Sequence, residues 1–296
     1  MPLTTPALGL LLVVLIWGGN FTATKLAFSE IPPLAFTAVR FTFGAVLMWL
    51  VLARREGWRL PPRATWLPLI LLGIVGNTIY QLCFMTGLSR TTATNSSLIL
   101  ASMPTVVTVA AGALGFEEVT ARQKWALAIA TLGVMLVVAS RGLTLEGGDL
   151  AGDMLMLAAV ACWATYTLGL RTLTGKVSTL ALTTWTLITG TPGLLIAGVP
   201  EAWRLNWHTV TARGWGGLAY ATLLSLVVAY VLWNRGVRQI GPSRAALFTT
   251  LTPLVATLTA IVVLGERPGL LHLAGGAMII AGVLVSRRPV RPAPAP

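Results

Sequence analysis

The sequence predicts an all-α integral membrane protein whose ten transmembrane helices form two inverted five-helix repeats. Two observations lead to this prediction. Hydrophobic residues make up 55% of the 296 residues and charged residues only 10%, with a mean hydropathy of +0.80, whereas a water-soluble domain carries about 25% charged residues. In addition, residues of the first half recur in the second half at a nearly constant offset.

The internal repeat divides the chain near its middle. The corresponding positions are Trp17 and Trp163, Lys25 and Arg171, Thr37 and Thr183, Gly44 and Gly190, Gly87 and Gly236, Pro104 and Pro253, Glu117 and Glu266, and Gly133 and Gly282. A period this long is typical of a duplicated domain rather than a solenoid array. We therefore expect a first repeat at 1–145, a second at 146–288, and a disordered, basic, Pro-rich tail at 289–296.

Ten apolar segments are long enough to be membrane spans. A bilayer core of about 30 Å needs roughly 20 apolar helical residues. The predicted spans are 7–28, 34–53, 66–88, 93–115, 123–141, 150–171, 179–199, 214–235, 242–265 and 270–286.

Helix-breaking residues separate these spans in order along the chain. The first span ends before Pro32-Pro33, the second before Pro61-Pro62 and the fifth before Gly147-Gly148. Gly241-Pro242 separates the eighth span from the ninth, and Pro268-Gly269 separates the ninth from the tenth. Such pairs are typical of turns.

The distribution of basic residues predicts that both termini are cytoplasmic. Cytoplasmic loops carry an excess of Lys and Arg. With the N-terminus inside, the inner loops and the tail hold 14 Lys and Arg residues, whereas the outer loops hold 5, namely Arg90, Arg141, Arg204, Arg213 and Arg267. Each half has five spans, an odd number, so the second half enters the membrane from the opposite side. Inverted repeats are typical of secondary transporters.

Composition also argues against several other classes of protein. The net charge of +12 sits in short clusters between apolar runs rather than on one basic face, so we expect contact with the lipid bilayer and no nucleic-acid partner. Cys83 and Cys162 both lie within apolar runs, where they offer neither a disulfide framework nor metal-ligand spacing. We expect no metal and no cofactor.

The motifs of the two halves resemble a known family. Trp17-Gly18-Gly19-Asn20-Phe21, Pro104 with Glu117, and Pro253 with Gly265-Glu266 are similar to the drug/metabolite transporter superfamily. More narrowly, the chain resembles its ten-helix EamA-domain exporters, including the bacterial aromatic amino-acid exporters. The resemblance implies a carrier in the bacterial cytoplasmic membrane that moves metabolites outward through a central cavity. The second copy, Cys162-Trp163-Ala164, lacks the Gly-Gly of the motif.

Polar and aromatic side chains on single faces of the spans are the candidate substrate-binding residues. Helical spacing places Trp17 and Asn20 on one face of the first span, and a buried amide costs free energy unless it is satisfied. The candidates are Trp17, Asn20, Asn77, Tyr80, Gln81, Phe84, Ser102, Met103, Trp163, Tyr166, Thr167 and Tyr230. Aromatic faces with neutral amides suit an apolar or aromatic solute that carries a zwitterion. The alternatives are interhelical hydrogen bonds, an interfacial belt for the aromatic residues, and core packing for Met103. For Trp233 and Asn234, which lie near a helix end, we favour these structural roles over substrate binding.

Pro104 and Pro253 occupy matching mid-helix positions and are candidate gating residues. A mid-helix proline frees the carbonyl four residues earlier, here that of Leu100 or Thr249, and can kink the helix. A static kink that only improves packing is the alternative.

Lys25 and Arg40 are the basic residues within the first two spans, and both are candidates for a charge role. Lys25 lies near the outer end, where it can snorkel to the interface. An intramembrane charge such as Arg40 is a functional candidate, although Glu30 or helix carbonyls could neutralise it. Glu117 and Glu266 terminate their helices, where an exposed or headgroup-facing position competes with any function.

These features predict a monomeric exporter of small metabolites, with aromatic or other neutral amino acids as the solute. No Asp or Glu lies in the middle of a span, so we expect facilitated diffusion or exchange by alternating access. A proton-coupled multidrug or other small-metabolite efflux carrier is the alternative. A membrane enzyme or a structural protein is disfavoured, because an enzyme would need converging acid, base or metal ligands.

Overall fold

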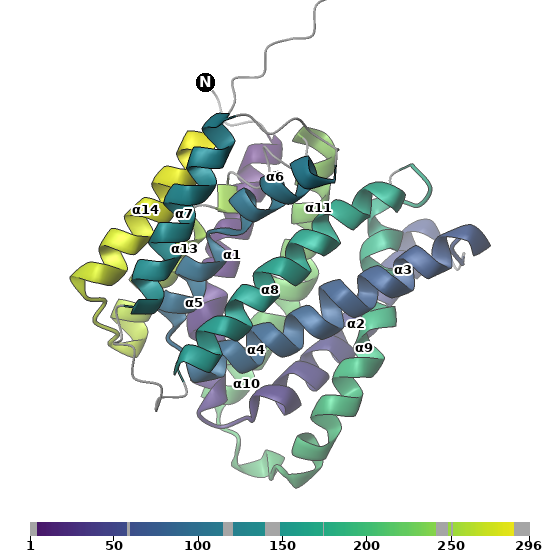
Figure 1. Ribbon diagram of the computed structural model, residues 1–296. Coiled ribbons are helices and arrows are strands. Elements are labelled where there is room, and N and C mark those ends of the chain that lie inside the picture. The colour runs from purple at the N-terminus through teal and green to yellow at the C-terminus, as the bar shows by residue number, and fades with distance from the viewer. Residues whose placement is uncertain are drawn as a thin grey trace, which may run out of the picture.

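The computed structural model describes residues 5–57, 60–114, 121–139, 149–173, 175–240, 248–249 and 251–286. Within these ranges the regular structure is helical throughout, and the helices coincide with the ten predicted spans (Figure 1). The first half contains α1 (Thr5–Phe28), α2 (Pro33–Glu56), α3 (Trp66–Gly73), η2 (Ile74–Ile79), α4 (Tyr80–Arg90), α5 (Ala93–Leu100), α6 (Met103–Ala113) and α7 (Ala121–Ala139). The second half contains α8 (Asp149–Gly169), α9 (Thr179–Arg204), α10 (Ala212–Ala219), η5 (Tyr220–Val228), α11 (Ala229–Ile240), α13 (Thr252–Thr259), η6 (Ala260–Leu264) and α14 (Leu270–Ser286). The predicted tail at 289–296, Glu117 and the turns at 147–148 and 241–242 lie outside the described residues.

Length, composition and surface all identify a membrane-spanning bundle. Among the described residues, six helices are long and apolar enough to cross a bilayer: 7–28, 33–56, 63–90, 150–169, 179–204 and 212–236. Large apolar side chains also face outward, as Ile196, Val262 and Leu270 do with 80–85% of their surface exposed. Such an outer surface suits lipid rather than water.

The contacts between helices keep the same pattern when each helix is replaced by its counterpart in the other half. The second and seventh spans, α2 and α9, pack together, and so do the fifth and tenth, α7 and α14 (Figure 1). The third span contacts the sixth through α4 and α8, and its counterpart contact joins α11 to α1. Likewise α6 contacts α8, and α13 contacts α1. This exchange confirms the predicted fold class of two inverted five-helix repeats.

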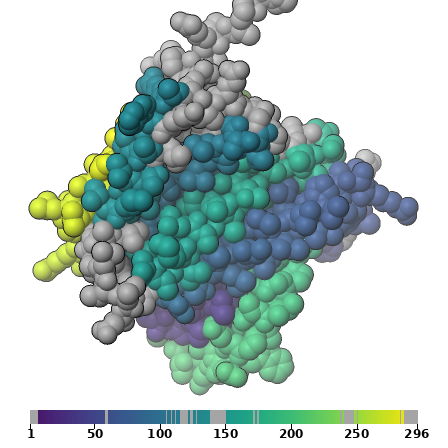
Figure 2. Space-filling view, in the orientation of Figure 1, coloured from purple at the N-terminus to yellow at the C-terminus, as the bar shows by residue number. Residues whose placement is uncertain are grey.

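Glycines let α7 and α14 approach closely on one flank of the molecule (Figure 2). A Cβ atom added to Gly275 would lie 2.6 Å from the carbonyl oxygen of Gly133, and one added to Gly133 would lie 2.6 Å from that of Gly275. A Cβ atom on Gly282 would similarly lie 2.7 Å from the carbonyl oxygen of Ala126. Small residues at such crossings are typical of transmembrane helix pairs.

The regular α-helix of the fourth span is interrupted near its proline by one tight turn. The chain passes from α5 to α6 at residues 101–102, with Pro104 in the first turn of α6, where its missing N–H leaves no hydrogen bond unmade. In this turn, Ser102 N donates to the Ile99 carbonyl at 3.1 Å.

The ninth span has the same turn. Leu251 N donates to the Phe248 carbonyl at 3.1 Å, at the position that matches the Ser102 bond, and Pro253 lies in the first turn of α13. Ala101, Ser102 and Leu251 keep right-handed helical φ and ψ angles, so the irregularity at each predicted kink is a single tight turn, and the described turns match in the two repeats.

Carboxylates cap the helices of the opposite half. Glu266 accepts hydrogen bonds from Ala93 N at 2.9 Å and from Thr94 N at 3.1 Å, which satisfies two open N–H groups at the start of α5. Gly265, in the left-handed conformation at φ 68°, ends η6 just before it, which explains the Gly-Glu pair of the motif. Glu201 caps α2 in the same way, at Leu34 N and Ala35 N.

Glu30, in the loop between α1 and α2, binds the start of α10. Its carboxylate accepts from Thr211 N at 2.6 Å and from the Thr211 hydroxyl at 2.8 Å. These bonds, helped by the nearby charge of Arg213, hold the pKa of Glu30 below its usual value. The contact therefore stabilises the fold at neutral pH and is lost as the pH falls through that lowered pKa.

Removing the Glu266 carboxylate is expected to destabilise the protein. Glu266→Ala leaves two amide N–H groups of α5 without their acceptor, a loss of about 1–3 kcal/mol. Thermal unfolding in detergent measures the effect, with the exposed neighbour Arg267→Ala as the matched control. Equal unfolding temperatures for the two variants would show that the cap does not stabilise α5.

Candidate functional site

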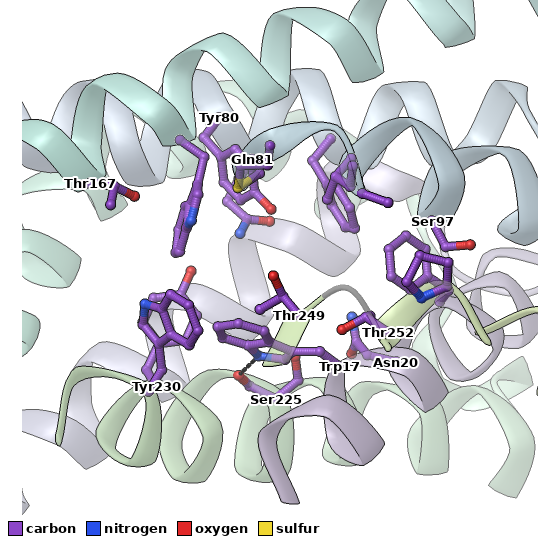
Figure 3. A pocket seen from close by; sticks show the side chains of 18 of the residues that line it. Trp17, Asn20, Tyr80, Gln81, Ser97, Thr167, Ser225, Tyr230, Thr249 and Thr252 are labelled. Carbon is purple, nitrogen blue, oxygen red and sulfur yellow. Dashed lines mark hydrogen bonds between the residues drawn. The ribbon is translucent and has the colours of Figure 1, made fainter. Parts of the chain in front are cut away.

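A cavity of about 120 Å³ lies where the two halves meet. Side chains from both repeats line it, and the turns in the fourth and ninth spans border it (Figure 3). The lining residues are Trp17, Asn20, Phe21, Arg40, Tyr80, Gln81, Phe84, Ser97, Leu100, Ala101, Met103, Val107, Trp163, Thr167, Ser225, Tyr230, Trp233, Thr249, Thr252 and Pro253. Discontinuous helices beside a central cavity are typical of transporters with inverted repeats.

A connected group of aromatic rings forms much of the cavity wall. The repeat-related residues Trp17 and Trp163 meet edge to face, with ring centroids 6.4 Å apart. Trp163 also lies 4.9 Å from Tyr80 and 5.9 Å from Tyr230 between ring centroids. Figure 3 shows Tyr80 on one side of the cavity, and Trp17 and Tyr230 on the other. Each repeat therefore supplies aromatic surface to the same space.

Hydrogen bonds to η5 hold two of the lining side chains in place. Trp17 Nε1 donates to the carbonyl of Ser225 at 3.1 Å. Arg40 Nε donates to the carbonyl of Ala221 at 3.0 Å, and Arg40 Nη2 donates to the Ser225 hydroxyl at 3.4 Å. The π-helical segment η5 thus fixes an indole and a guanidinium at the cavity wall. Segments of this kind occur frequently at functional sites.

Four polar atoms of the lining have no hydrogen-bond partner among the described residues. They are Asn20 Oδ1, Arg40 Nη1, Gln81 Oε1 and Thr252 Oγ1. Buried polar groups are nearly always hydrogen-bonded. A ligand or water in the cavity would supply the missing partners, which marks this space as the candidate binding site.

Most of the predicted substrate-binding residues come together at this cavity. Trp17, Asn20, Tyr80, Gln81, Phe84, Met103, Trp163, Thr167 and Tyr230 line it, together with the gating candidate Pro253 and the charge candidate Arg40. Of the two candidate partners for Arg40, the structure shows carbonyls rather than Glu30, which binds Thr211 instead.

Three predicted residues point elsewhere, each for a physical reason. Asn77 belongs to η2, whose wider π-helical winding turns it away from the face of α4, and its amide donates to the Thr186 carbonyl at 3.0 Å. The Tyr166 ring packs against Gly76, where a Cβ atom would lie 2.2 Å from it. The Ser102 hydroxyl donates to the Ile99 carbonyl at 2.7 Å.

Lys25 is not among the described residues that line the cavity, and the side chain of Pro104 lies outside what the structure describes. Pro104 follows the tight turn described above. The ammonium of Lys25 lies 3.4 Å from the carbonyl of Ser89 and donates to it, at the end of α4. A charge role for Lys25 stays a prediction.

Several lining residues were not among the predicted ones. A structural role was favoured for Trp233, yet it lines the cavity, where its ring lies 5.4 Å from that of Trp17. Asn234 is buried and its amide donates to the Thr183 hydroxyl of α9, an interhelical hydrogen bond of the kind favoured for it from the sequence. Phe21 and Ser225 had signals in the sequence, namely the Trp17–Phe21 motif and a serine inside an apolar run. Thr249 and Thr252, which lie close to the turn in the ninth span, also line the cavity.

The family profile of the EamA-like transporters matches the chain twice, at residues 4–139 and at residues 150–288. The chain belongs to the EamA-like transporter family. This membership agrees with the fold and identifies the protein as a multi-pass membrane transporter rather than an enzyme.

Individual relatives are similar to this EamA-like transporter over nearly its whole length. A probable amino-acid metabolite efflux pump of Salmonella typhimurium is 28% identical over 291 residues, which cover 93% of this chain and 92% of the relative. A probable terminal-alkyne amino-acid exporter of Streptantibioticus cattleyicolor is 27% identical over 289 residues, which cover 97% and 95%. A protein crystal structure aligns with a TM-score of 0.68 at 20% identity, over 96% of this chain and 97% of its own, and shows the same fold.

Proposed function

We propose that this EamA-like transporter exports amino acids, aromatic or otherwise neutral, across the bacterial cytoplasmic membrane. The observation that carries the proposal is the cavity between the repeats, which combines stacked aromatic rings with unpartnered amide oxygens of Asn20 and Gln81. Aromatic faces accept an apolar side chain, and amide oxygens accept hydrogen bonds from an ammonium group. Two relatives whose names refer to amino-acid export add support.

The proposed mechanism is alternating access by a monomer with both termini in the cytoplasm. The paired turns at 101–102 and 251 border the cavity, so movement of α6 and α13 about these turns would open it to one side or the other. Pro104 and Pro253 are the proposed gating residues, because each prevents an unbroken helix at that point. The cavity has a volume of about 120 Å³, whereas ligand pockets usually have volumes of about 300–1,000 Å³. The small volume is what a closed state of the transporter would have.

We further propose facilitated diffusion or exchange without proton coupling. Among the described residues that line the cavity there is no Asp, Glu or His to bind and release a proton. The carboxylates of Glu30, Glu201 and Glu266 instead cap helices at the ends of the spans. A proton-coupled multidrug carrier would be expected to hold a carboxylate beside its cationic solute.

Flux in proteoliposomes tests the proposal. Vesicles loaded with unlabelled L-phenylalanine are expected to accumulate external labelled L-phenylalanine, and protein-free vesicles are not. Because no proton is involved, an uncoupler is expected to leave this exchange unchanged when no potential is imposed. Exchange that collapses with the uncoupler would contradict the coupling proposal, and a lack of flux for every amino acid in a panel would contradict the proposed substrate class.

A further inference from the structure

Arg40 is a buried charge deep within a membrane span. It lies seven residues after the start of α2, about 10 Å along the helix, and only 2% of its surface is exposed. Its partners, the Ala221 carbonyl and the Ser225 hydroxyl, are both neutral. The two bonds hold the guanidinium against η5 and leave Nη1 without a hydrogen-bond partner in the described part of the chain, at the cavity that Arg40 lines.

The acidic residues whose side chains the structure describes are engaged elsewhere. Their carboxylates bind other spans: Glu30 binds Thr211, Glu56 binds Ser178, Asp153 binds Thr91, Glu201 binds Leu34 and Ala35, and Glu266 binds Ala93 and Thr94. None of them lines the cavity. A buried charge without a counter-charge carries a large desolvation penalty. The described cavity therefore has a positive group that a negative ligand would neutralise.

We infer that Arg40 binds the carboxylate of the transported solute through its free Nη1 group. This inference deepens the proposed function and rests on it in taking the cavity as the solute site. A guanidinium forms strong, directional hydrogen bonds to carboxylates and keeps its charge when buried. The solute class is a small carboxylate, and a cation without a carboxylate is repelled.

The unpartnered acceptors of the cavity extend this assignment to a zwitterion. Asn20 Oδ1 and Gln81 Oε1 require donors, whereas Arg40 Nη1 requires an acceptor. The ammonium and carboxylate of one amino acid satisfy both requirements, and the aromatic rings then accept its side chain. This division separates the two ends of the solute: Arg40 selects the carboxylate, and the amides select the ammonium.

Binding to the detergent-solubilised protein tests the inference through the fluorescence of the cavity tryptophans. The probes share a phenyl ring: 3-phenylpropanoate carries only a carboxylate, phenethylamine only an ammonium group, and L-phenylalanine both. In Arg40→Gln, 3-phenylpropanoate is expected to bind about 10- to 100-fold more weakly, because a hydrogen bond to a charged group is lost. Phenethylamine is expected to bind as well as before or more tightly, because a like charge has gone.

Arg54→Gln is the matched control, since Arg54 is an exposed residue of the same helix, and its affinities should match those of the parent. Arg40→Lys keeps the charge without the planar fork, and serves if Arg40→Gln does not fold. It is expected to weaken 3-phenylpropanoate binding about 3- to 10-fold and to leave phenethylamine unchanged.

Two results would overturn the inference: a parent protein that does not prefer 3-phenylpropanoate over phenethylamine, or an equal loss of both probes in the Arg40 variant. The proposed function fails separately, when the reconstituted parent moves no amino acid. In that case an Arg40-dependent preference for 3-phenylpropanoate would still support a carboxylate site.

Discussion

Trp163→Ala is expected to reduce amino-acid flux at least about tenfold. The Trp163 ring touches aromatic rings from three other spans, those of Trp17, Tyr80 and Tyr230. Its loss removes the central face of the cavity wall, and each aromatic contact contributes about 0.5–1.5 kcal/mol beyond burial. Two such contacts with the solute correspond to a tenfold change or more in affinity. Labelled L-phenylalanine exchange in proteoliposomes measures the effect.

The same substitution leaves a void in the protein interior. Removing a buried tryptophan side chain costs about 3–5 kcal/mol in soluble proteins, so thermal unfolding must be followed beside flux. Trp163→Phe keeps an aromatic face and is expected to retain more flux than Trp163→Ala. Trp203→Ala is the matched control, because the Trp203 side chain is 86% exposed at the end of α9. Flux in Trp163→Ala equal to that of the control would remove Trp163 from the solute site.

Gly275→Ala is expected to destabilise the fold by about 1–3 kcal/mol, and Gly275→Leu by more. A Cβ atom at this position would lie 2.6 Å from the Gly133 carbonyl oxygen and 2.7 Å from Val137 Cγ2. Backbone cannot move aside as the end of a side chain can, so α7 and α14 must separate. Alanine favours a helix over glycine by about 1 kcal/mol, but the loss of contact along the helix pair outweighs this gain.

Gly216→Ala is the matched control for the helix-pair variant. Gly216 also lies within a helix, α10, but nothing lies within 4 Å of a Cβ atom added there. This substitution is expected to leave stability unchanged or to raise it by up to about 1 kcal/mol. Thermal unfolding in detergent compares the two variants. If Gly275→Ala unfolds no earlier than Gly216→Ala, the close approach of α7 and α14 does not stabilise the protein.

The positions of the spans were predictable from sequence because length and hydrophobicity along the chain determine which segments cross a bilayer. The duplication was predictable for a similar reason, since Pro104 and Pro253, or Gly133 and Gly282, are visible as matched positions. The prolines also indicated where the fourth and ninth spans are irregular. That each irregularity is a tight turn between two α-helical segments, with matching hydrogen bonds at Ser102 and Leu251, required the structure.

The cavity was predictable only where α-helical spacing holds. Tyr80, Gln81 and Phe84 share one regular helix, α4, and were placed on one face correctly. Asn77 does not share that face, because it lies within the π-helical η2, whose wider winding changes the spacing. The irregular winding leaves no simple signal in a single sequence. For the same reason, the π-helical η5 that positions Trp17 and Arg40 could not be foreseen.

The contact between α7 and α14 has the symmetry of an isologous dimer interface. Gly133 faces Gly275, and Ala126 faces Gly282. Gly282 is the repeat counterpart of Gly133, and Ala126 occupies the position that corresponds to Gly275. The two contacts are therefore related to each other by exchange of the two halves. In homodimers, such a surface is complementary to a rotated copy of itself. Each half therefore carries its own copy of the surface through which the two halves pack. The covalent link keeps the halves close together, whereas these matching surfaces determine how they align.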